Sequence, residues 1–212
     1  MKGSLKKVIV DACKRMTAAE LVRGTWGNVS VRDEDKIYIT ASGFSYEIMR
    51  ESDVMVIDME GNILDGPHKP SSEWKLHVAI YKARPDVECI LHTHPIYSSI
   101  AAVTLESVPS LIEDTAMICG PEVKVAEYGD PGSWELANNT VAALGDNGAA
   151  IMRNHGLVNV GTRFSEVFVG ANVTEKNVQI YLEALKLGKK IYELPEETKV
   201  TLRKAYKEMY RQ

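Results

Sequence analysis

Residues 87–94 have the sequence VECILHTH, a mostly apolar run that ends in two histidines separated by one residue. A short apolar run of this kind is typical of a buried strand. Side chains two residues apart in a strand point to the same face. His92 and His94 are therefore predicted to present two imidazoles side by side where a buried strand ends.

The sequence on either side of this strand alternates between strand and helix patterns. Two alternating runs predict a hairpin, residues 28–31 and 37–40, and a second hairpin is predicted over 53–64. Helices are predicted over residues 4–22, 71–82, 164–187 and 196–210, and shorter helices after residues 95 and 133. Further strands are predicted over residues 123–128, 149–153 and 156–160. We expect a single α/β domain over residues 1–212, with a mixed, mostly antiparallel central sheet flanked by helices and a helical tail over about 196–212.

The composition narrows the class of protein. The chain has 212 residues, with 25 Lys and Arg against 29 Asp and Glu, which gives a net charge of −4. This balance argues against a basic face for nucleic acid, and no apolar stretch approaches the roughly 20 residues of a membrane span. The three cysteines show no C-x-x-C spacing, which favours a reducing cytoplasm over a disulfide framework. A soluble cytoplasmic protein is expected, with no membrane or nucleic-acid partner.

The histidine pair is a candidate metal site, although H-x-H spacing alone also fits two histidines that form hydrogen bonds on a sheet face. His155 lies in the sequence RNHG, residues 153–156, where a predicted strand ends in a glycine turn. Together the three histidines would leave one open coordination position, as catalytic zinc requires. The spacing does not show whether His155 reaches the pair.

Glu73 follows Ser71 and Ser72 at the predicted start of a helix, and two interpretations remain open. The serines and the acid could simply cap the helix and complement its dipole. Alternatively, the exposed amides and two hydroxyls could bind an anion, with Glu73 beside it as a general acid/base. His77 lies on the same helix face and is interpreted as a packing residue. The loops GTWGN (24–28) and TASG (40–43) fit either plain turns or phosphate-cradling loops.

Taken together, GNVS (27–30), ITASG (39–43), PSSE (70–73), HTH (92–94) and NHG (154–156) resemble the class II, zinc-dependent sugar-phosphate aldolase and epimerase family, which includes the L-fuculose-1-phosphate aldolases. The resemblance runs from about residue 5 to about residue 190 and implies the class II aldolase/adducin-like fold. It also implies a C4 homotetramer with active sites between subunits.

The resemblance implies a role for each motif. His92, His94 and His155 would bind one Zn²⁺ per subunit. Glu73 would be the catalytic acid/base, which in the empty enzyme can close the fourth metal position. The substrate phosphate would be held by Gly27, Asn28, Ser42, Gly43, Ser71 and Ser72. The implied reaction is reversible cleavage of a ketose 1-phosphate to dihydroxyacetone phosphate and a small aldehyde. The metal would stabilise the enediolate as a Lewis acid, and Glu73 would protonate it.

Two departures from the family pattern concern the aldehyde end of the pocket. Glu113, beside Asp114, stands where fuculose-phosphate aldolases have a tyrosine, and Pro131 stands where they have a phenylalanine. Glu113 is a candidate second acid/base, as a glutamate is in the related methylthioribulose-1-phosphate dehydratases; the alternative is that both acids lie in a misaligned surface loop. Tyr206 and Tyr210 are candidates for the tail tyrosine that family members lend to a neighbouring subunit.

Other activities remain open within the same fold. These are a pentulose-phosphate 4-epimerase, a methylthioribulose-1-phosphate dehydratase and a 3-oxo-tetronate-4-phosphate decarboxylase. The epimerases usually carry Asp in place of Glu73, and the decarboxylase requires a carboxylate-binding cation that the sequence does not identify. A non-catalytic binding module resembling the adducin head domain has no need of Glu73 or the three histidines, so their presence favours an enzyme.

Overall fold

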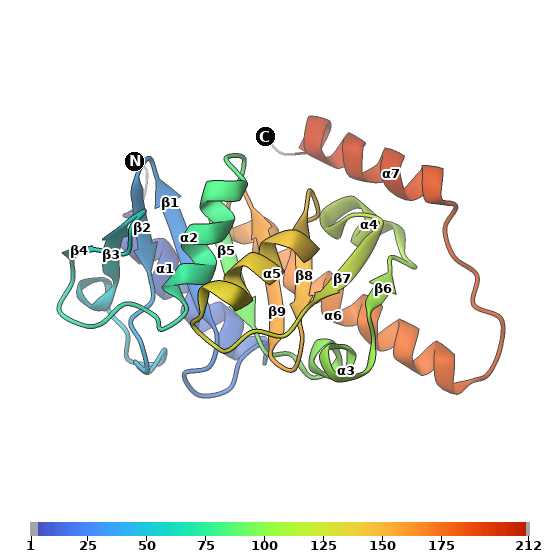
Figure 1. The fold of residues 1–212 in the computed structure, drawn as a ribbon, viewed down its shortest axis with the longest axis horizontal. Helices are drawn as coiled ribbons and strands as arrows, with labels where there is room; N and C mark the ends of the chain where they lie inside the picture. Colours follow the sequence, from blue (N-terminus) through green and yellow to red (C-terminus); the bar gives the residue numbers. More distant parts are fainter. Residues whose placement is uncertain (1–3, 211–212) are drawn as a thin grey trace.

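The computed structural model describes residues 4–210, except the side chain of Tyr210, and places nine strands in one sheet (Figure 1). The order across the sheet is β4-β3-β2-β1-β5-β9-β8-β7-β6. Their bounds are β1 (Asn28–Asp33), β2 (Lys36–Ile39), β3 (Met55–Asp58), β4 (Ile63–Asp65), β5 (Cys89–Thr93), β6 (Ser107–Pro109), β7 (Glu122–Ala126), β8 (Ala149–Met152) and β9 (Gly156–Gly161). Within the described chain β7 and β8 pair in parallel, and the other neighbouring strands pair antiparallel. The predicted mixed, mostly antiparallel sheet is confirmed.

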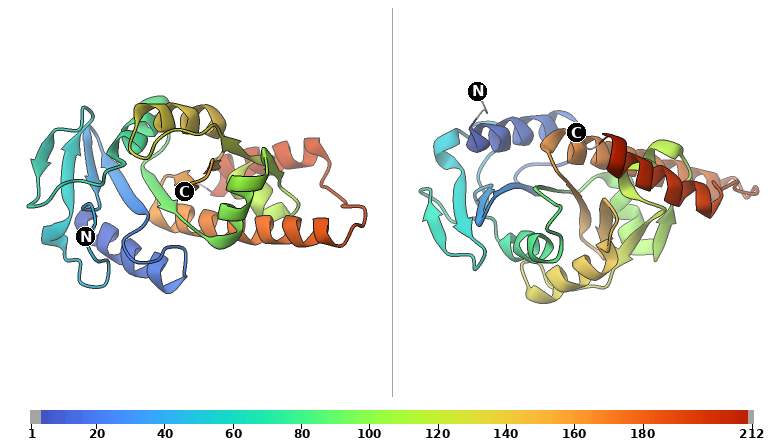
Figure 2. Two further views of the ribbon diagram at one scale, coloured as in Figure 1. Left: turned by 60° about the horizontal axis from the view of Figure 1, so that its bottom comes forward. Right: turned by 90° about the horizontal axis from the view of Figure 1, so that it is seen from above.

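Helices cover both faces of this sheet. Figure 2 shows α1 (Leu5–Ala18) and α6 (Phe164–Lys186) on one face, and α2 (Trp74–Ala83) and α5 (Trp134–Leu144) on the other. Alternation along β5 explains this arrangement, because Ile90 packs with α2 and α5 whereas Leu91 packs with α1 and α6. The remaining helices are α3 (Ile96–Thr104), α4 (Glu113–Cys119), α7 (Glu196–Ala205), a 3₁₀ turn at Glu51–Asp53 and a π-helical turn at Tyr206–Tyr210.

Strand β5 lies near the middle of the sheet and leads into the histidine pair. It pairs with β1 on one side and with β9 on the other, so that His92 is opposite both Asn28 and Val158. Ile90, Leu91 and His92 are fully buried. The histidines are therefore fixed at the end of one of the most constrained strands in the molecule.

Several predicted boundaries need correction. The first helix ends at Ala18 rather than at 22, because Glu20 has a left-handed φ of 55° that an α-helix cannot contain. Helix α2 begins at Trp74, not at 71, and Glu73 occupies its N-cap position. Neither serine caps it in the predicted way; instead the Ser71 hydroxyl accepts a 3.3 Å hydrogen bond from the backbone of Glu73. Strand β6 and helix α4 are not among the predicted elements, because their few residues give too short a pattern.

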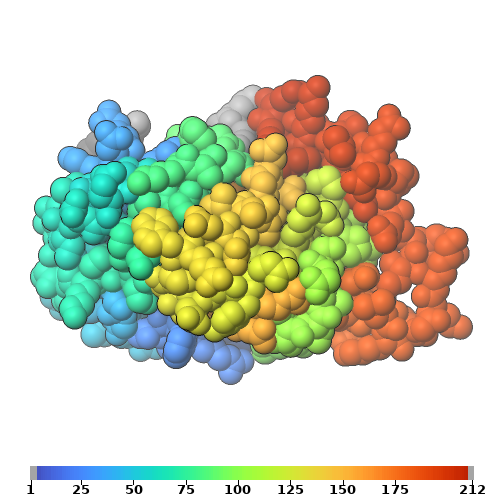
Figure 3. All heavy atoms as spheres, viewed as in Figure 1, coloured from blue at the N-terminus to red at the C-terminus, as the bar shows by residue number. Residues whose placement is uncertain are grey.

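The predicted terminal helix corresponds to α7 and the π-helical turn that follows it. Helix α7 packs against α4, and Figure 3 shows it at the opposite end of the molecule from the first two hairpins. No helix among residues 4–210 has the length and apolar character needed to cross a membrane.

Candidate metal and active site

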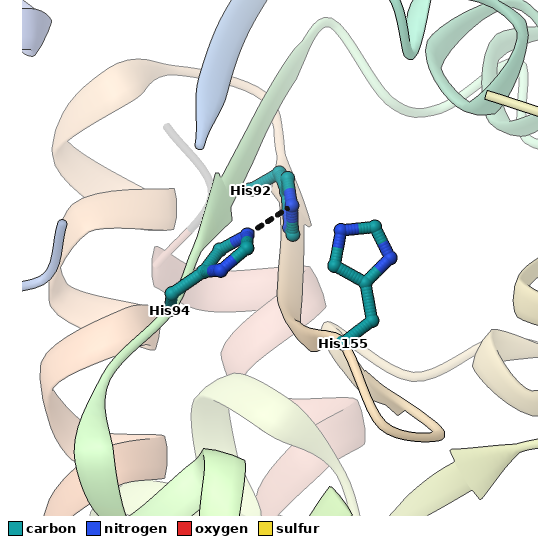
Figure 4. A group of neighbouring side chains, drawn as sticks. All are labelled: His92, His94 and His155. Atoms are coloured by element: carbon teal, nitrogen blue, oxygen red, sulfur yellow. Dashed lines mark hydrogen bonds between the residues drawn. The ribbon is translucent and has the colours of Figure 1, made fainter. Parts of the chain in front are cut away.

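Three histidines converge where β5 ends and the β8–β9 turn passes it (Figure 4). One ring nitrogen from each of His92, His94 and His155 lies within 4.8 Å of the others. The ring centroids are 4.6, 4.9 and 5.2 Å apart. The structure therefore brings His155 to the pair, which the sequence spacing alone left open.

The tight β8–β9 turn brings His155 close to β5. Asn154 adopts a left-handed φ of 56°, which asparagine tolerates better than most residues. Gly156 lies two residues further along the turn. A Cβ at this position would lie 2.5 Å from the carbonyl oxygen of Thr93 and 3.2 Å from Cε1 of His92. Only glycine allows the turn to approach β5 this closely.

His92 has the orientation of a metal ligand. Its Nδ1 donates a 3.0 Å hydrogen bond to the carbonyl oxygen of Leu157, which can only accept, so the proton resides on Nδ1. The lone pair of Nε2 then faces the cluster, 2.8 Å from Nε2 of His94. Metal-binding histidines commonly donate their other ring N–H in this way, which fixes tautomer and ring orientation.

Glu73 extends from the N-cap of α2 into this cluster and does not cap the helix. Its Oε2 lies 3.2 Å from Nε2 of His92, and its Oε1 lies 3.2 Å from Nε2 of His155. Oε1 is buried and accepts no hydrogen bond from the residues that the structure describes. Burial alone would raise the pKa of Glu73, but the His92 and His155 rings and the bond from Asn28 together hold that pKa well below its usual value.

The pKa values of the histidines favour neutral rings at two of the three positions. Burial, reinforced by the neighbouring rings, lowers the pKa of His94 to about 3 and that of His155 to about 4. For His92, burial acts in the same direction, but the Glu73 carboxylate outweighs it and raises the pKa. Neutral imidazoles are what a metal ion binds. Three convergent ring nitrogens and a buried carboxylate oxygen without a hydrogen bond fit a divalent cation.

A pocket of about 330 Å³ opens beside the cluster. It is lined by the predicted phosphate residues and by two of the histidines with Glu73: Gly27, Asn28, Ser42, Gly43, Ser71, Ser72, Glu73, His94 and His155. Thr25, Trp26, Asn154 and Pro131 also line it. Trp26, for which the sequence suggests no separate role, is 69% exposed, and the centroid of its ring lies 6.3 Å from that of His94.

Three loops form the wall that carries the small and hydroxyl side chains. The amide of Ser42 donates to the carbonyl of Lys69 and the amide of Ser71 to that of Thr40, which ties the loop after β2 to the segment before α2. In the third loop, Gly27 has a left-handed φ of 93°, and a Cβ there would lie 2.7 Å from the carbonyl oxygen of His92. Sheet geometry therefore places these loops next to the histidines.

The other predicted residues lie outside the pocket lining. Glu113 begins α4 with an exposed side chain, and Asp114 forms an ion pair with Lys176. Tyr206 belongs to the π-helical turn after α7 and does not line the pocket either. The side chain of Tyr210 is outside the described residues. Within this chain, Glu113 and Tyr206 are not brought together with Glu73.

His77, interpreted from the sequence as a packing residue, is buried as expected and also takes part in a hydrogen-bond network. It is fully buried, but both ring nitrogens are hydrogen-bonded: Nε2 lies 2.5 Å from Oδ1 of Asn28 and Nδ1 lies 2.6 Å from the hydroxyl of Ser30. Its partners are more than 45 residues away in the sequence, so a local pattern could not reveal them. His77 belongs to a buried polar network directly behind Glu73.

Comparisons with known proteins identify the family of this chain. The family described as "Class II Aldolase and Adducin N-terminal domain" matches residues 7–182. The L-fuculose phosphate aldolase of Escherichia coli K12 is 33% identical over 87% of this chain and 85% of the relative. The 5-methylthioribulose-1-phosphate/5-deoxyribulose-1-phosphate aldolase of Rhodospirillum rubrum is 33% identical over 89% of this chain and 86% of the relative.

Among solved structures, one titled "L-fuculose 1-phosphate aldolase" superposes with a TM-score of 0.92 at 31% identity and covers 98% of both chains. The match extends through the sheet and the helices on both of its faces. By its sequence, its fold and its relatives, the chain belongs to the class II aldolase family and is a lyase of that family.

Proposed function

We propose that this protein is a zinc-dependent aldolase that reversibly cleaves a ketose 1-phosphate to dihydroxyacetone phosphate and a small aldehyde. The observation that carries the proposal is the position of Glu73. Its buried carboxylate lies 3.2 Å from each of two histidines of a three-histidine cluster, on the wall of a pocket whose other walls are glycine and serine loops. That combination would supply a metal site, a proton carrier and a phosphate cradle in one cavity.

His92, His94 and His155 would hold the Zn²⁺. When bound, the ion supplies fixed positive charge beside the substrate oxygens, where negative charge develops as the carbon–carbon bond breaks. The nitrogen ligand set suits zinc, and three protein ligands leave a position for substrate. No lysine is required in this reaction as a Schiff-base nucleophile.

The chain's own residues would bind the phosphate and move the proton. The substrate phosphate would bind Gly27, Asn28, Ser42, Gly43, Ser71 and Ser72. Cleavage transfers the proton of the C4 hydroxyl to a base, breaks the C3–C4 bond and leaves the electron pair on the dihydroxyacetone phosphate fragment. In the cleavage direction Glu73 would carry a proton in the substrate complex, deliver it to C3 and be left as the carboxylate; in the synthetic direction the carboxylate would take that proton back. The proton that the base takes from the C4 hydroxyl and the proton that Glu73 needs for the next cleavage would exchange with solvent.

Glu113 would serve the aldehyde end of the pocket as the second acid/base. Because Glu113 lies outside the pocket lining of its own chain, this role requires a neighbouring subunit. It therefore belongs with the proposal of a homotetramer whose active sites lie between subunits, with the tail over about 196–212 contributing contacts.

A cytoplasmic location is also part of the proposal, and it fits three buried cysteines that form no disulfide.

The test uses purified, zinc-loaded protein and a panel of ketose 1-phosphates: fuculose, rhamnulose, ribulose, 5-deoxyribulose and methylthioribulose. Dihydroxyacetone phosphate is detected through a coupled reductase. We expect release from at least one substrate, and the Escherichia coli and Rhodospirillum rubrum relatives are named for three of the five. No release from any of them by protein that contains zinc would reject the aldolase and favour the epimerase, dehydratase or decarboxylase.

A further inference from the structure

A chain of buried hydrogen bonds connects the interior of the protein to Glu73. The hydroxyl of Tyr81 lies 2.7 Å from that of Ser30, and the Ser30 hydroxyl lies 2.6 Å from Nδ1 of His77. Nε2 of His77 lies 2.5 Å from Oδ1 of Asn28, whose Nδ2 donates to Oε2 of Glu73 over 2.8 Å. Five side chains are thus joined in a single line.

The line follows from matched spacing on two elements. Glu73, His77 and Tyr81 recur every four residues along one face of the α2 segment, a rise of about 6 Å per step. Asn28 and Ser30 are two residues apart on β1, a step of about 6.6 Å. Val29 and Val31 point to the other face and pack in a separate core cluster. The helix and the strand therefore hold their polar residues in register.

The line has one possible direction. Asn28 turns its NH₂ group to Oε2 of Glu73, which accepts the hydrogen bond, so its carbonyl oxygen faces His77. His77 must then carry its proton on Nε2 and accept at Nδ1 from the hydroxyl of Ser30. The opposite order would set the Asn28 oxygen against the Glu73 oxygen. The tautomer of His77 is thereby coupled to the orientation of Asn28.

Burial makes this coupling rigid. Ser30 and His77 are 0% exposed, and Tyr81 and Asn28 are 1% and 3% exposed. Burial lowers the pKa of His77 to about 3, so the ring is neutral at physiological pH. A buried polar group that loses its partner costs about 1–3 kcal/mol. Alternative orientations of Asn28 are therefore disfavoured.

We propose that His77 is a positioning residue that, through Asn28, holds Oε2 of Glu73 and so fixes the carboxylate against the histidine cluster in the geometry for proton transfer. The inference rests on the proposed function. It assigns Asn28 a task besides phosphate binding: both ends of its carboxamide are engaged, and its second amide N–H remains available to the pocket. Oε1 of Glu73, which accepts no hydrogen bond from the described residues, is left to exchange the proton.

The experiment compares two isosteric substitutions in zinc-loaded protein. In His77→Gln the side-chain amide replaces the Nε2–H donor to Asn28, whereas in His77→Asn the amide reaches Ser30 but not Asn28. We expect kcat to fall less than about 10-fold in His77→Gln and about 10–100-fold in His77→Asn, the range for outer-shell partners in metal sites. KM and zinc content should be unchanged in both. His68→Gln, at the partly exposed histidine paired with Asp53, is the control and should retain wild-type kcat.

Equal kcat in His77→Gln and His77→Asn would overturn the proposal, and so would a loss that appears in KM or zinc content instead of kcat. A second measurement does not depend on the variants folding: ¹⁵N NMR of histidine-labelled, zinc-loaded wild-type protein. A proton on Nε2 of His77 supports the directed line to Glu73, and a proton on Nδ1 or a charged ring overturns it. Absence of turnover in the wild-type protein would instead reject the proposed function, a result distinct from any difference between variants.

Discussion

Nδ1 of His92 donates a hydrogen bond to the carbonyl oxygen of Leu157, across the pairing of β5 with β9. This one contact determines which nitrogen of His92 faces the other histidines. It also explains why the cluster forms at this point of the sheet, because the β9 backbone that receives the bond begins directly after the turn that carries His155. Sheet pairing therefore sets both the tautomer of one candidate ligand and the position of another.

Substitution of His92 should remove the metal. His92→Ala deletes a candidate ligand whose ring is fully buried and already oriented, so we expect zinc affinity to fall by more than the roughly 100-fold seen for outer-shell partners, and turnover to be lost with it. Elemental analysis after dialysis measures the zinc content. His68→Ala is the matched control, and an unchanged zinc content in His92→Ala would place the metal elsewhere.

Glu73→Gln separates proton transfer from binding. The glutamine oxygen can still accept from Nδ2 of Asn28, so zinc and phosphate binding should persist while turnover falls about 10²–10⁴-fold, the usual contribution of a general acid/base. Single-turnover rates and the affinity for a phosphate competitor measure the two effects. Near-normal turnover in this variant would show that Glu73 is not the proton carrier.

Gly156→Ala tests the close approach of the β8–β9 turn. The added Cβ would lie 2.5 Å from the carbonyl oxygen of Thr93 and would press on His92, so we expect a loss of about 1–3 kcal/mol in stability and weaker zinc binding. Gly188→Ala is the control, because it has a left-handed φ of 61° but open space around it. If both variants bind zinc equally well, steric contact at Gly156 does not shape the site.

The strands and helices that depend on local periodicity could be predicted from the sequence. The arrangement of site residues that depends on contacts between distant parts of the chain could not. The hairpins, the central strand and the long helices were identified because alternation and helical spacing are visible within a few residues. His155 was a candidate from its motif, but only the turn at Asn154 and Gly156 brings it to His92. The burial of His77 was expected, but its hydrogen bonds could not be predicted, because its polar partners lie on β1 and no local pattern records that contact.

The free energy of unfolding of the zinc-free protein should depend on His77 in acid. The folded pKa of this ring is lowered by burial from 6.5 to about 3, so below 6.5 the unfolded chain takes up a proton that the folded chain does not. The contribution of His77 to the free energy of unfolding is therefore fully present above pH 6.5. It falls by about 1.4 kcal/mol per pH unit as the pH drops from 6.5 toward 3. Urea unfolding across this range should show a shallower slope for His77→Gln than for wild type. Equal slopes would mean that His77 is not neutral in the folded state.

Mixing two slow variants tests whether Glu113 acts on a neighbouring subunit. Glu113 is exposed at the start of α4 and lies outside the pocket of its own chain. If it reaches the pocket of another subunit, Glu113→Gln should slow carbon–carbon cleavage with little change in phosphate affinity. In a tetramer reassembled from equal amounts of Glu73→Gln and Glu113→Gln subunits, roughly a quarter of the sites would combine an intact Glu73 with an intact neighbouring Glu113.

We therefore expect the mixture to recover roughly a quarter of wild-type activity, whereas either variant reassembled alone stays slow. Asp114→Asn is the matched control, because Asp114 is adjacent in sequence but paired with Lys176 on α6; its activity should be that of wild type. Recovery in the mixture requires that the two carboxylates of one site come from different chains. A mixture no faster than the average of its components, from subunits shown to have exchanged, would show that Glu113 does not act on a neighbouring subunit's site, and an unchanged rate in Glu113→Gln alone would place Glu113 outside the catalytic site.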